Sequence, residues 1–257
     1  MKTPCALLIL SLCALPVAAR DTIDRQLEAD PTSEVSISVT NGTIKIVGWD
    51  EPKVSVQGTR NGEAGEFSVD RDGRSIDIDD SAYDHDGPAA ESNLTIQVPR
   101  GSSVDVDIIS GRVEVQGING EIEVGAVSGD VNVVADSPRI SLESVSGDVT
   151  VSNAGALTRG SFTSVSGDVV VDGALAEGAD LELESVSGDI TLSVRGELNA
   201  RIDVETGPGG AIRNGLSADK PEREHYSGSE TLSLRLGPGS ADVRASVVTG
   251  SVTLEKK

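Results

Sequence analysis

The stretch LESVSGDVTV, residues 142–151, contains a tetrapeptide, Val-Ser-Gly-Asp, that recurs along the middle of the chain. Its successive copies are 18, 20 and 21 residues apart. A fixed spacing of this length indicates a repeat architecture, in which each repeat is one small structural unit that stacks on its neighbours. The copies are Val127–Asp130, Val145–Asp148, Val165–Asp168 and Val186–Asp189, with related corners at Ile109-Ser-Gly-Arg and Thr206-Gly207.

Each repeat has two short runs in which apolar and polar residues alternate, such as Val131 and Val133 in one run and Ile140 and Leu142 in the other. A period of two is typical of strands with one buried face. One repeat buries too few side chains to fold alone, so the repeats must stack, with strands of adjacent coils about 4.8 Å apart and parallel. We therefore predict an all-β fold, a parallel β-helix or β-solenoid with about 18–21 residues per coil.

The repeated tetrapeptide is interpreted as a corner that every coil turns at the same place. Glycine adopts positive φ without a side-chain clash, and the flanking Ser and Asp can bond nearby backbone groups. We expect the valine of each copy to point inward and anchor the corner. The residues concerned are Val127, Val145, Val165 and Val186, with glycines Gly129, Gly147, Gly167 and Gly188.

Two other readings of these patterns remain open. The aspartates Asp130, Asp148, Asp168 and Asp189 would stack as a carboxylate ladder, which could hold calcium, although the glycine-rich nine-residue calcium repeat is absent. The dipeptides Asn41-Gly42 and Asn119-Gly120 are hairpin signals, which would favour an antiparallel sandwich. The constant glycine spacing favours the solenoid, because a sandwich has no reason to keep it.

The chain opens with a segment that has the features of a secretory signal peptide, residues 1–19. Lys2 is followed by an apolar stretch and by small residues at Val17-Ala18-Ala19. A lipoprotein signal ending at Cys13 is the alternative, but Leu12 stands where a small residue is expected. Both cysteines lie in this leader, so the mature chain would have neither disulfides nor thiolate metal sites. We predict export to the periplasm or the medium.

The formal net charge is −21, and loss of Lys2 makes it one unit more negative. Such a charge disfavours nucleic acid and anionic lipid as partners. Aromatic residues form 2% of the chain, which leaves few flat rings for a sugar-binding groove.

Residues 36–58, 94–115 and 236–257 resemble the opening strand pair, lead-in and closing coil of a known family, the bacterial "putative adhesin" domain. The resemblance implies an exported, β-helical repeat domain of unknown function without a recognised active site. We accordingly expect a single domain over residues 20–257. Residues 20–100 would form an N-terminal strand and cap region, 101–210 the regular repeats, and 211–257 an insertion and a closing coil that caps the other end.

Three further segments are candidate sites. Residues 67–79 resemble a calcium loop, but Ser68 replaces the first aspartate ligand, so a hairpin with an Asp72-Gly73 turn is preferred. Residues 77–87 gather aspartates around His85, which suggests either a metal site or a solvated acidic loop. Residues 219–230 interrupt the repeat and contain His225 beside Tyr226, as a binding loop or an ordinary insertion.

Neither histidine accompanies a nucleophile motif, and the coil exteriors are mostly Ser, Thr, Asn, Asp and Glu. We therefore assign no catalytic, cofactor-binding or metal-ligating residue. The predicted function is a non-enzymatic, adhesin-like binding or structural module of the cell envelope. Its partner would be an envelope protein or glycan, and the chain would not span the membrane and would be a monomer or an end-to-end dimer. The alternatives are a β-helical enzyme acting on polysaccharide and a calcium-dependent binding module.

Overall fold

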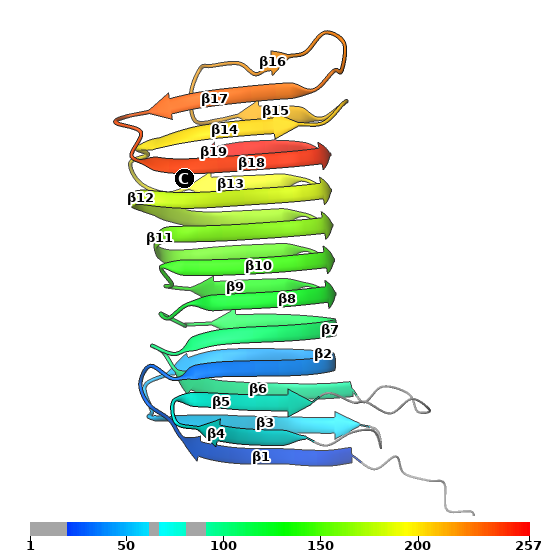
Figure 1. Ribbon diagram of the computed structural model, residues 1–257, viewed down its shortest axis with the longest axis vertical. Coiled ribbons are helices and arrows are strands. Elements are labelled where there is room, and N and C mark those ends of the chain that lie inside the picture. The colour runs from blue at the N-terminus through cyan, green and yellow to red at the C-terminus, as the bar shows by residue number, and fades with distance from the viewer. Residues whose placement is uncertain (1–19, 62–66, 81–90) are drawn as a thin grey trace, which may run out of the picture.

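The computed structural model describes residues 20–61, 67–80 and 91–257. All helix-or-strand structure in these ranges is β-strand, which confirms the all-β prediction, and the strands stack along one long axis (Figure 1). No helix with the length and apolar character needed to cross a membrane occurs in these ranges. The strands are β1 (Arg20–Glu28), β2 (Glu34–Trp49), β3 (Lys53–Asn61), β4 (Ser68–Asp72), β5 (Ser75–Asp80), β6 (Glu91–Pro99), β7 (Ser103–Gln116), β8 (Ile122–Ser128), β9 (Val131–Ala135), β10 (Arg139–Ser146), β11 (Val149–Ser166), β12 (Val169–Ser187), β13 (Ile190–Val194), β14 (Ala200–Thr206), β15 (Ala211–Asn214), β16 (Glu222–Arg223), β17 (Glu230–Leu236), β18 (Ala241–Thr249) and β19 (Ser251–Lys256).

Successive repeats pair in parallel, as predicted. In β10, for example, Leu142 lies opposite Val124 of β8 on one edge and opposite Phe162 of β11 on the other. Each coil contributes one strand to each of two ladders. The first ladder contains β5, β8, β10, β18, β14, the opening halves of β2 and β7 and the closing halves of β11 and β12. The second contains β6, β9, β13, β19, β15 and the remaining halves of those strands.

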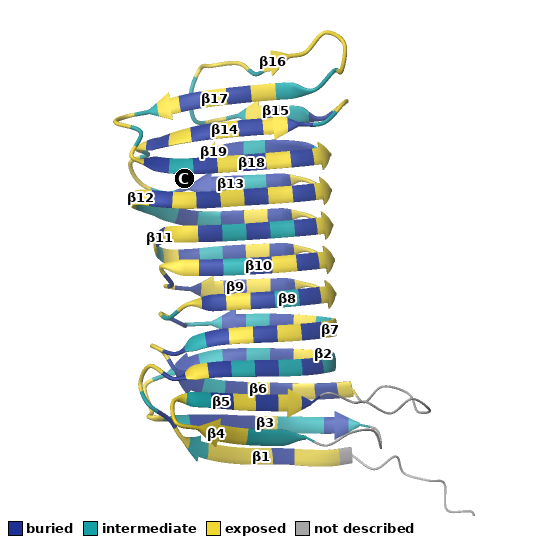
Figure 2. Cartoon of the chain, in the orientation of Figure 1, coloured by how far each residue is buried: buried dark blue, intermediate teal, exposed yellow. Residues whose placement is uncertain are grey.

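The core lies between the two ladders. Along nearly every strand buried and exposed residues alternate, and the buried positions line up from coil to coil (Figure 2). Nearly all the buried apolar side chains are Val, Ile, Leu or Ala, with Phe162 as the bulkiest. Full burial of one such aliphatic side chain is worth about 1.5–3 kcal/mol, so the stacked columns supply the stability that the cysteine-free repeats require.

The corner glycines have the backbone conformation that the repeat predicts. Gly147 has φ +129°, its N–H donates to the carbonyl of Ser166 at 2.9 Å, and a Cβ there would lie 2.1 Å from the carbonyl oxygen of Gly129. Only glycine allows both this φ and this close approach of two backbones. The corners that stack in this way are Gly42, Gly111, Gly129, Gly147, Gly167, Gly188 and Gly250.

The corner aspartates bond backbone, as expected, but the bond reaches across to the next coil. The N–H of Asp168 donates to Oδ1 of Asp148 at 3.0 Å, and the N–H of Asp189 donates to Oδ1 of Asp168 at 2.8 Å. Each carboxylate therefore satisfies a donor at the corner above it, and the ladder of aspartates ties the coils together.

The antiparallel sandwich is wrong. Asn41-Gly42 lies inside β2, where Gly42 forms a corner, and the strands on either side of Asn119-Gly120 pair in parallel. The turn signals are real, but each turn leads the chain to the next coil rather than back along the same sheet. The Asp72-Gly73 turn does form the predicted hairpin, with β4 and β5 antiparallel and Gly73 at φ +62°.

At the N-terminal end, residues from the first hundred cover the stack, as predicted. β3 pairs antiparallel with β6, β1 pairs antiparallel with β3, and β4 covers β5. The coil formed by β2 is not at the end of the stack, because it lies between β5 and β6 on one side and β7 on the other.

The prediction that the C-terminal coil caps the other end is wrong. β18 and β19 insert between β12–β13 and β14–β15, so the last coil in sequence is internal in space. Thr249-Gly250 repeats the Ser187-Gly188 corner and stacks directly on it, with Gly188 N–H donating to the Thr249 carbonyl at 3.1 Å. The end of the stack is covered instead by β17, antiparallel to β14, and by the short β16.

Candidate functional site

The valines of the corner tetrapeptides point outward, which corrects the prediction that they anchor the corner from inside. Together with their counterparts in neighbouring coils they form a line of exposed aliphatic side chains, 45–56% exposed. The residues just before and after each of them pair across the coils, so the line follows the long axis of the stack. We call this line the aliphatic row: Ile109, Val127, Val145, Val165, Val186 and Val248.

The strand period explains why the prediction failed. Leu142 is buried, so a period of two places Glu143 outside, Ser144 inside and Val145 outside. The prediction took the valine to be buried because it is hydrophobic, instead of counting the alternation of inward and outward residues along the strand. Counting from Leu142 or from Leu183 would have located the aliphatic row in the sequence.

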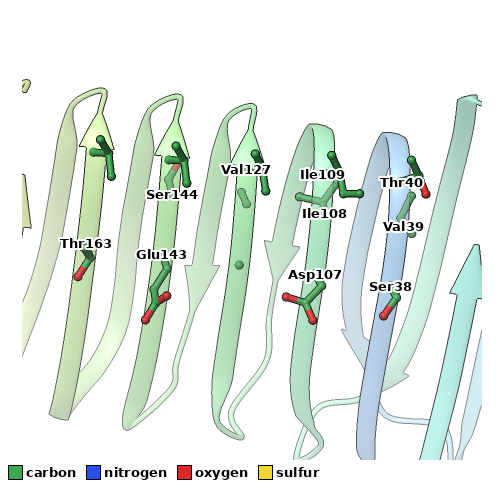
Figure 3. Close-up of a pocket in the computed structure, with 14 residues that line it drawn as sticks. Ser38, Val39, Thr40, Asp107, Ile108, Ile109, Val127, Glu143, Ser144 and Thr163 are labelled. Atoms are coloured by element: carbon green, nitrogen blue, oxygen red, sulfur yellow. The ribbon is translucent and has the colours of Figure 1, made fainter. Parts of the chain in front are cut away.

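A groove of about 480 Å³ runs beside one end of the aliphatic row. Its walls come from consecutive coils of the first ladder, and Val127, Ile109 and Thr40 follow one another at the corner end of their strands (Figure 3). Gly125 leaves a gap between Asp107 and Glu143, its neighbours in adjacent coils. The groove is therefore apolar along the corner and polar along the strand side.

The strand side of the aliphatic row is acidic. The outward position two residues before the row carries Asp107, Glu143 and Glu184 in different coils. At the next outward position, two residues earlier in each strand, Asp105 lies opposite Glu123. Burial, and then the charge of Asp107, raises the pKa of Asp105, and the Asp105 charge is the main cause that raises the pKa of Glu123. The raised pKa of Glu123 therefore reflects a local excess of negative charge.

Across the corner, the row is bordered by the exposed serines and then by the corner aspartates. Asp130 forms an ion pair with Arg112 at 3.1 Å. In the following coils Asp148 and Asp168 each accept a backbone N–H through one oxygen. The aliphatic row thus has carboxylates on both sides.

Directly behind the row, the inward position of three consecutive coils is serine. The hydroxyls of Ser144, Ser164 and Ser185 are buried, and none of them has a hydrogen-bond partner among the described residues. The preceding coils have Ile108 and Ala126 at the same position. Ser144 also lines the groove, whereas Ser164 and Ser185 do not.

The described residues contain no group of three or more His, Cys, Asp or Glu side chains arranged to hold a metal ion. Of the acidic segment 77–87, residues 81–87, including His85, lie outside the described residues. Asp80 is buried and pairs with Arg60 at 2.8 Å, and it accepts a hydrogen bond from Ser92. The structure therefore gives this carboxylate a role in holding β3, β5 and β6 together.

The segment 219–230 lies at the capped end of the stack. Tyr226 is 97% exposed and meets the ring of His225 edge to face, with ring centroids 5.4 Å apart. Glu230 receives the N–H of Ile212 at 2.8 Å, and this bond is the main cause that lowers the pKa of Glu230. The segment therefore contributes at least one contact that fixes the cap.

The stacked parallel coils with covered ends define a β-repeat protein, and the sequence comparison places it in a family. The model of the Toastrack DUF4097 family matches residues 32–185, which is more than half of the chain. The chain belongs to this family. No curated protein matches the chain with significance.

Several solved structures are similar to the chain. One is described as a "putative adhesin" from Bacteroides fragilis NCTC 9343, with 15% identity, a TM-score of 0.48, and coverage of 92% of this chain and 97% of that one. Another "putative adhesin", from Parabacteroides merdae ATCC 43184, has 8% identity, a TM-score of 0.34, and coverage of 91% and 95%. A "putative cell adhesion protein" from Clostridium sporogenes ATCC 15579 has 9% identity, a TM-score of 0.31, and coverage of 92% and 100%. The match to the family model confirms the resemblance expected from the sequence.

Proposed function

We propose that the chain is a non-enzymatic, exported binding module of the cell envelope, adhesin-like, that uses the aliphatic row as its contact surface. The observation that supports this most is the row itself. The strand exteriors otherwise carry mostly polar and charged residues, yet one aliphatic side chain stands exposed at the same corner of consecutive coils. A contiguous apolar line bordered by polar residues is typical of a surface that meets a partner.

The scaffold suits such a role. Parallel ladders that run through every coil fix the spacing of the exposed side chains, so the backbone that carries the row loses little conformational freedom on binding. The partner would be an envelope protein, and binding would be by contact alone, without chemistry on the partner.

The test is a comparative capture from envelope extracts, with residues 20–257 as bait. Val145→Thr with Val165→Thr keeps side-chain shape and strand propensity but makes the row polar. Val134→Thr with Val170→Thr makes the same change at exposed positions of the second ladder, 47% and 36% exposed. We expect a partner that wild type and the second-ladder variant retain and the row variant loses. Equal capture by all three baits would contradict the proposal.

Export is tested separately. We expect the protein from fractionated cells to be found in the periplasm or medium, with an N-terminus at Arg20. Recovery of the chain with Met1 in the cytoplasm would contradict this part of the proposal.

A further inference from the structure

The spacing of the aliphatic row restricts the shape of what it binds. Adjacent coils are about 4.8 Å apart, so the row from Ile109 to Val248 extends over about 24 Å. Figure 3 shows the start of this line, where Thr40, Ile109 and Val127 follow one another from strand to strand. A partner that follows the row must offer an apolar group at nearly the same interval.

An α-helix meets this requirement better than an extended strand. Apolar residues three and four positions apart on one helix face are separated along the axis by about 5.3 Å on average. The mismatch with the row is about 0.5 Å per coil, which adds up to about half a step over the whole row. Side chains on one face of a strand are about 6.8 Å apart and lose register within two coils. About 16 helical residues cover 24 Å.

The charge beside the row restricts the chemistry of the helix. Asp107, Glu143 and Glu184 stand on the strand side of the row, and the corner aspartates stand across the corner. A helix seated on the row would place the residues that flank its apolar face next to these carboxylates. Lys and Arg at those positions gain from the contact, whereas Asp and Glu are repelled.

The same charges disfavour two other partners that could cover an exposed apolar row, a second copy of the chain and an anionic lipid. A second copy would bring the same acidic borders, and the formal charge of each chain is −21. The headgroup of an anionic lipid would meet the same repulsion. We propose that the aliphatic row is the docking site for a basic amphipathic helix of about 16 residues from a partner protein. This inference rests on the proposed function of the row as the contact surface.

The probe is a synthetic 16-residue peptide with Leu at helical spacing and Lys elsewhere, labelled with fluorescein and titrated with residues 20–257. The comparison peptide has Glu at every Lys. We expect saturable binding of the Lys peptide, a gain of helical circular dichroism on binding, and weaker binding as salt is raised. The Glu peptide should not bind.

Two variants test whether the Lys peptide binds at the aliphatic row. Val145→Thr with Val165→Thr should weaken binding of the Lys peptide at least tenfold. Gly125→Thr should also weaken it, because it fills the groove, and a Cβ at Gly125 meets only the flexible Oδ1 of Asp107, at 2.8 Å. Val134→Thr with Val170→Thr is the matched control and should bind as wild type. Thermal unfolding of each variant establishes that it is folded.

The possible failures separate the two proposals. Failure of the Lys peptide to bind, or equal binding of the Glu peptide, overturns the basic helix. If dodecylphosphocholine monomers bind at the row instead, or if sedimentation shows a dimer that the row variant abolishes, the occupant is an acyl chain or a second copy, and the row remains a contact surface. If the Lys peptide binds the row variant as tightly as wild type, the inference is wrong. The row loses its proposed function if the capture experiment also shows no difference.

Discussion

At the scale of single residues, the corner depends on a hydrogen atom where any other amino acid has a carbon. Gly147 combines φ +129° with a carbonyl oxygen 2.1 Å from the position of a Cβ. Its neighbours in the stack are glycines in the same conformation, so the backbone of one coil cannot move away without displacing the next. The repeated glycine is therefore a requirement of backbone contact between coils, not of reactivity.

Gly147→Ala is expected to destabilise the protein by about 3–5 kcal/mol, from backbone strain and from overlap with the Gly129 carbonyl. Urea unfolding followed by circular dichroism measures the change. Gly178→Ala is the control, because Gly178 has φ +73° but no atom within 4 Å of the point that a Cβ would occupy. It should cost about 1–2 kcal/mol. Equal losses at both positions would show that close approach is unimportant.

The buried serine hydroxyls behind the aliphatic row are positions at which a substitution should increase the stability of the protein. Ser164 is 1% exposed and its hydroxyl has no partner among the described residues. Ser164→Ala should therefore raise the free energy of unfolding by about 1 kcal/mol, because the unfolded state no longer gains by solvating the hydroxyl. Denaturant unfolding provides the measurement, with the exposed Ser166→Ala expected to change nothing. A loss of stability in Ser164→Ala would imply that its hydroxyl is bonded.

At the scale of the strand, the face that carries Asp105 and Glu123 places like charges opposite one another. Partial burial is the main cause that raises the pKa of Asp105, followed by the charge of Asp107. A carboxyl whose folded pKa lies above its unfolded value binds its proton more tightly in the folded state. Its contribution to stability is therefore unfavourable above the folded pKa and disappears as the pH falls to the unfolded value.

Asp105→Asn should accordingly stabilise the protein at neutral pH, and the gain should shrink as the pH is lowered through the window between the two pKa values of Asp105. Melting temperatures from pH 7 down to pH 4 measure it. Asn132→Ala, at an exposed position of the second ladder that carries no titratable group, is the control and should show no such trend. A stability gain for Asp105→Asn that stays constant or grows toward low pH would contradict a raised pKa of Asp105 in the folded protein.

Much of the strand structure could be predicted from the sequence, because a period of two is a local property. Val131 and Val133 are buried as predicted, and the glycine spacing gave the parallel register. Two features were not accessible in this way. The outward orientation of Val145 could be predicted only by counting the alternation of inward and outward residues along the strand up to the corner. The position of β18 and β19 inside the stack depends on contacts between coils that are far apart in the sequence.

At the scale of the whole molecule, the first and last coils of the sequence are each the second coil from an end of the stack. The β2 coil lies inside the coil of β5 and β6, and the coil of β18 and β19 lies inside that of β14 and β15. Antiparallel strands cover the outermost coils. β1 and β3 close one end, and β17 closes the other. Covering the outermost coils in this way blunts the exposed edges at which a stack of parallel strands would otherwise pair with another chain. The repeats between the caps should then be interchangeable units, since each contacts only its neighbours.

Removal of one whole coil tests this central claim most directly. Deletion of residues 149–168 joins Asp148 to Val169, so that a corner is still followed by the strand that normally follows a corner. Deletion of residues 149–158 removes half as much but places later corners out of register. The account predicts that the larger deletion gives a folded protein with cooperative thermal unfolding and a β-type circular dichroism spectrum, and that the smaller one does not fold. If the two deletion variants behave alike, the coil is not the unit of this structure.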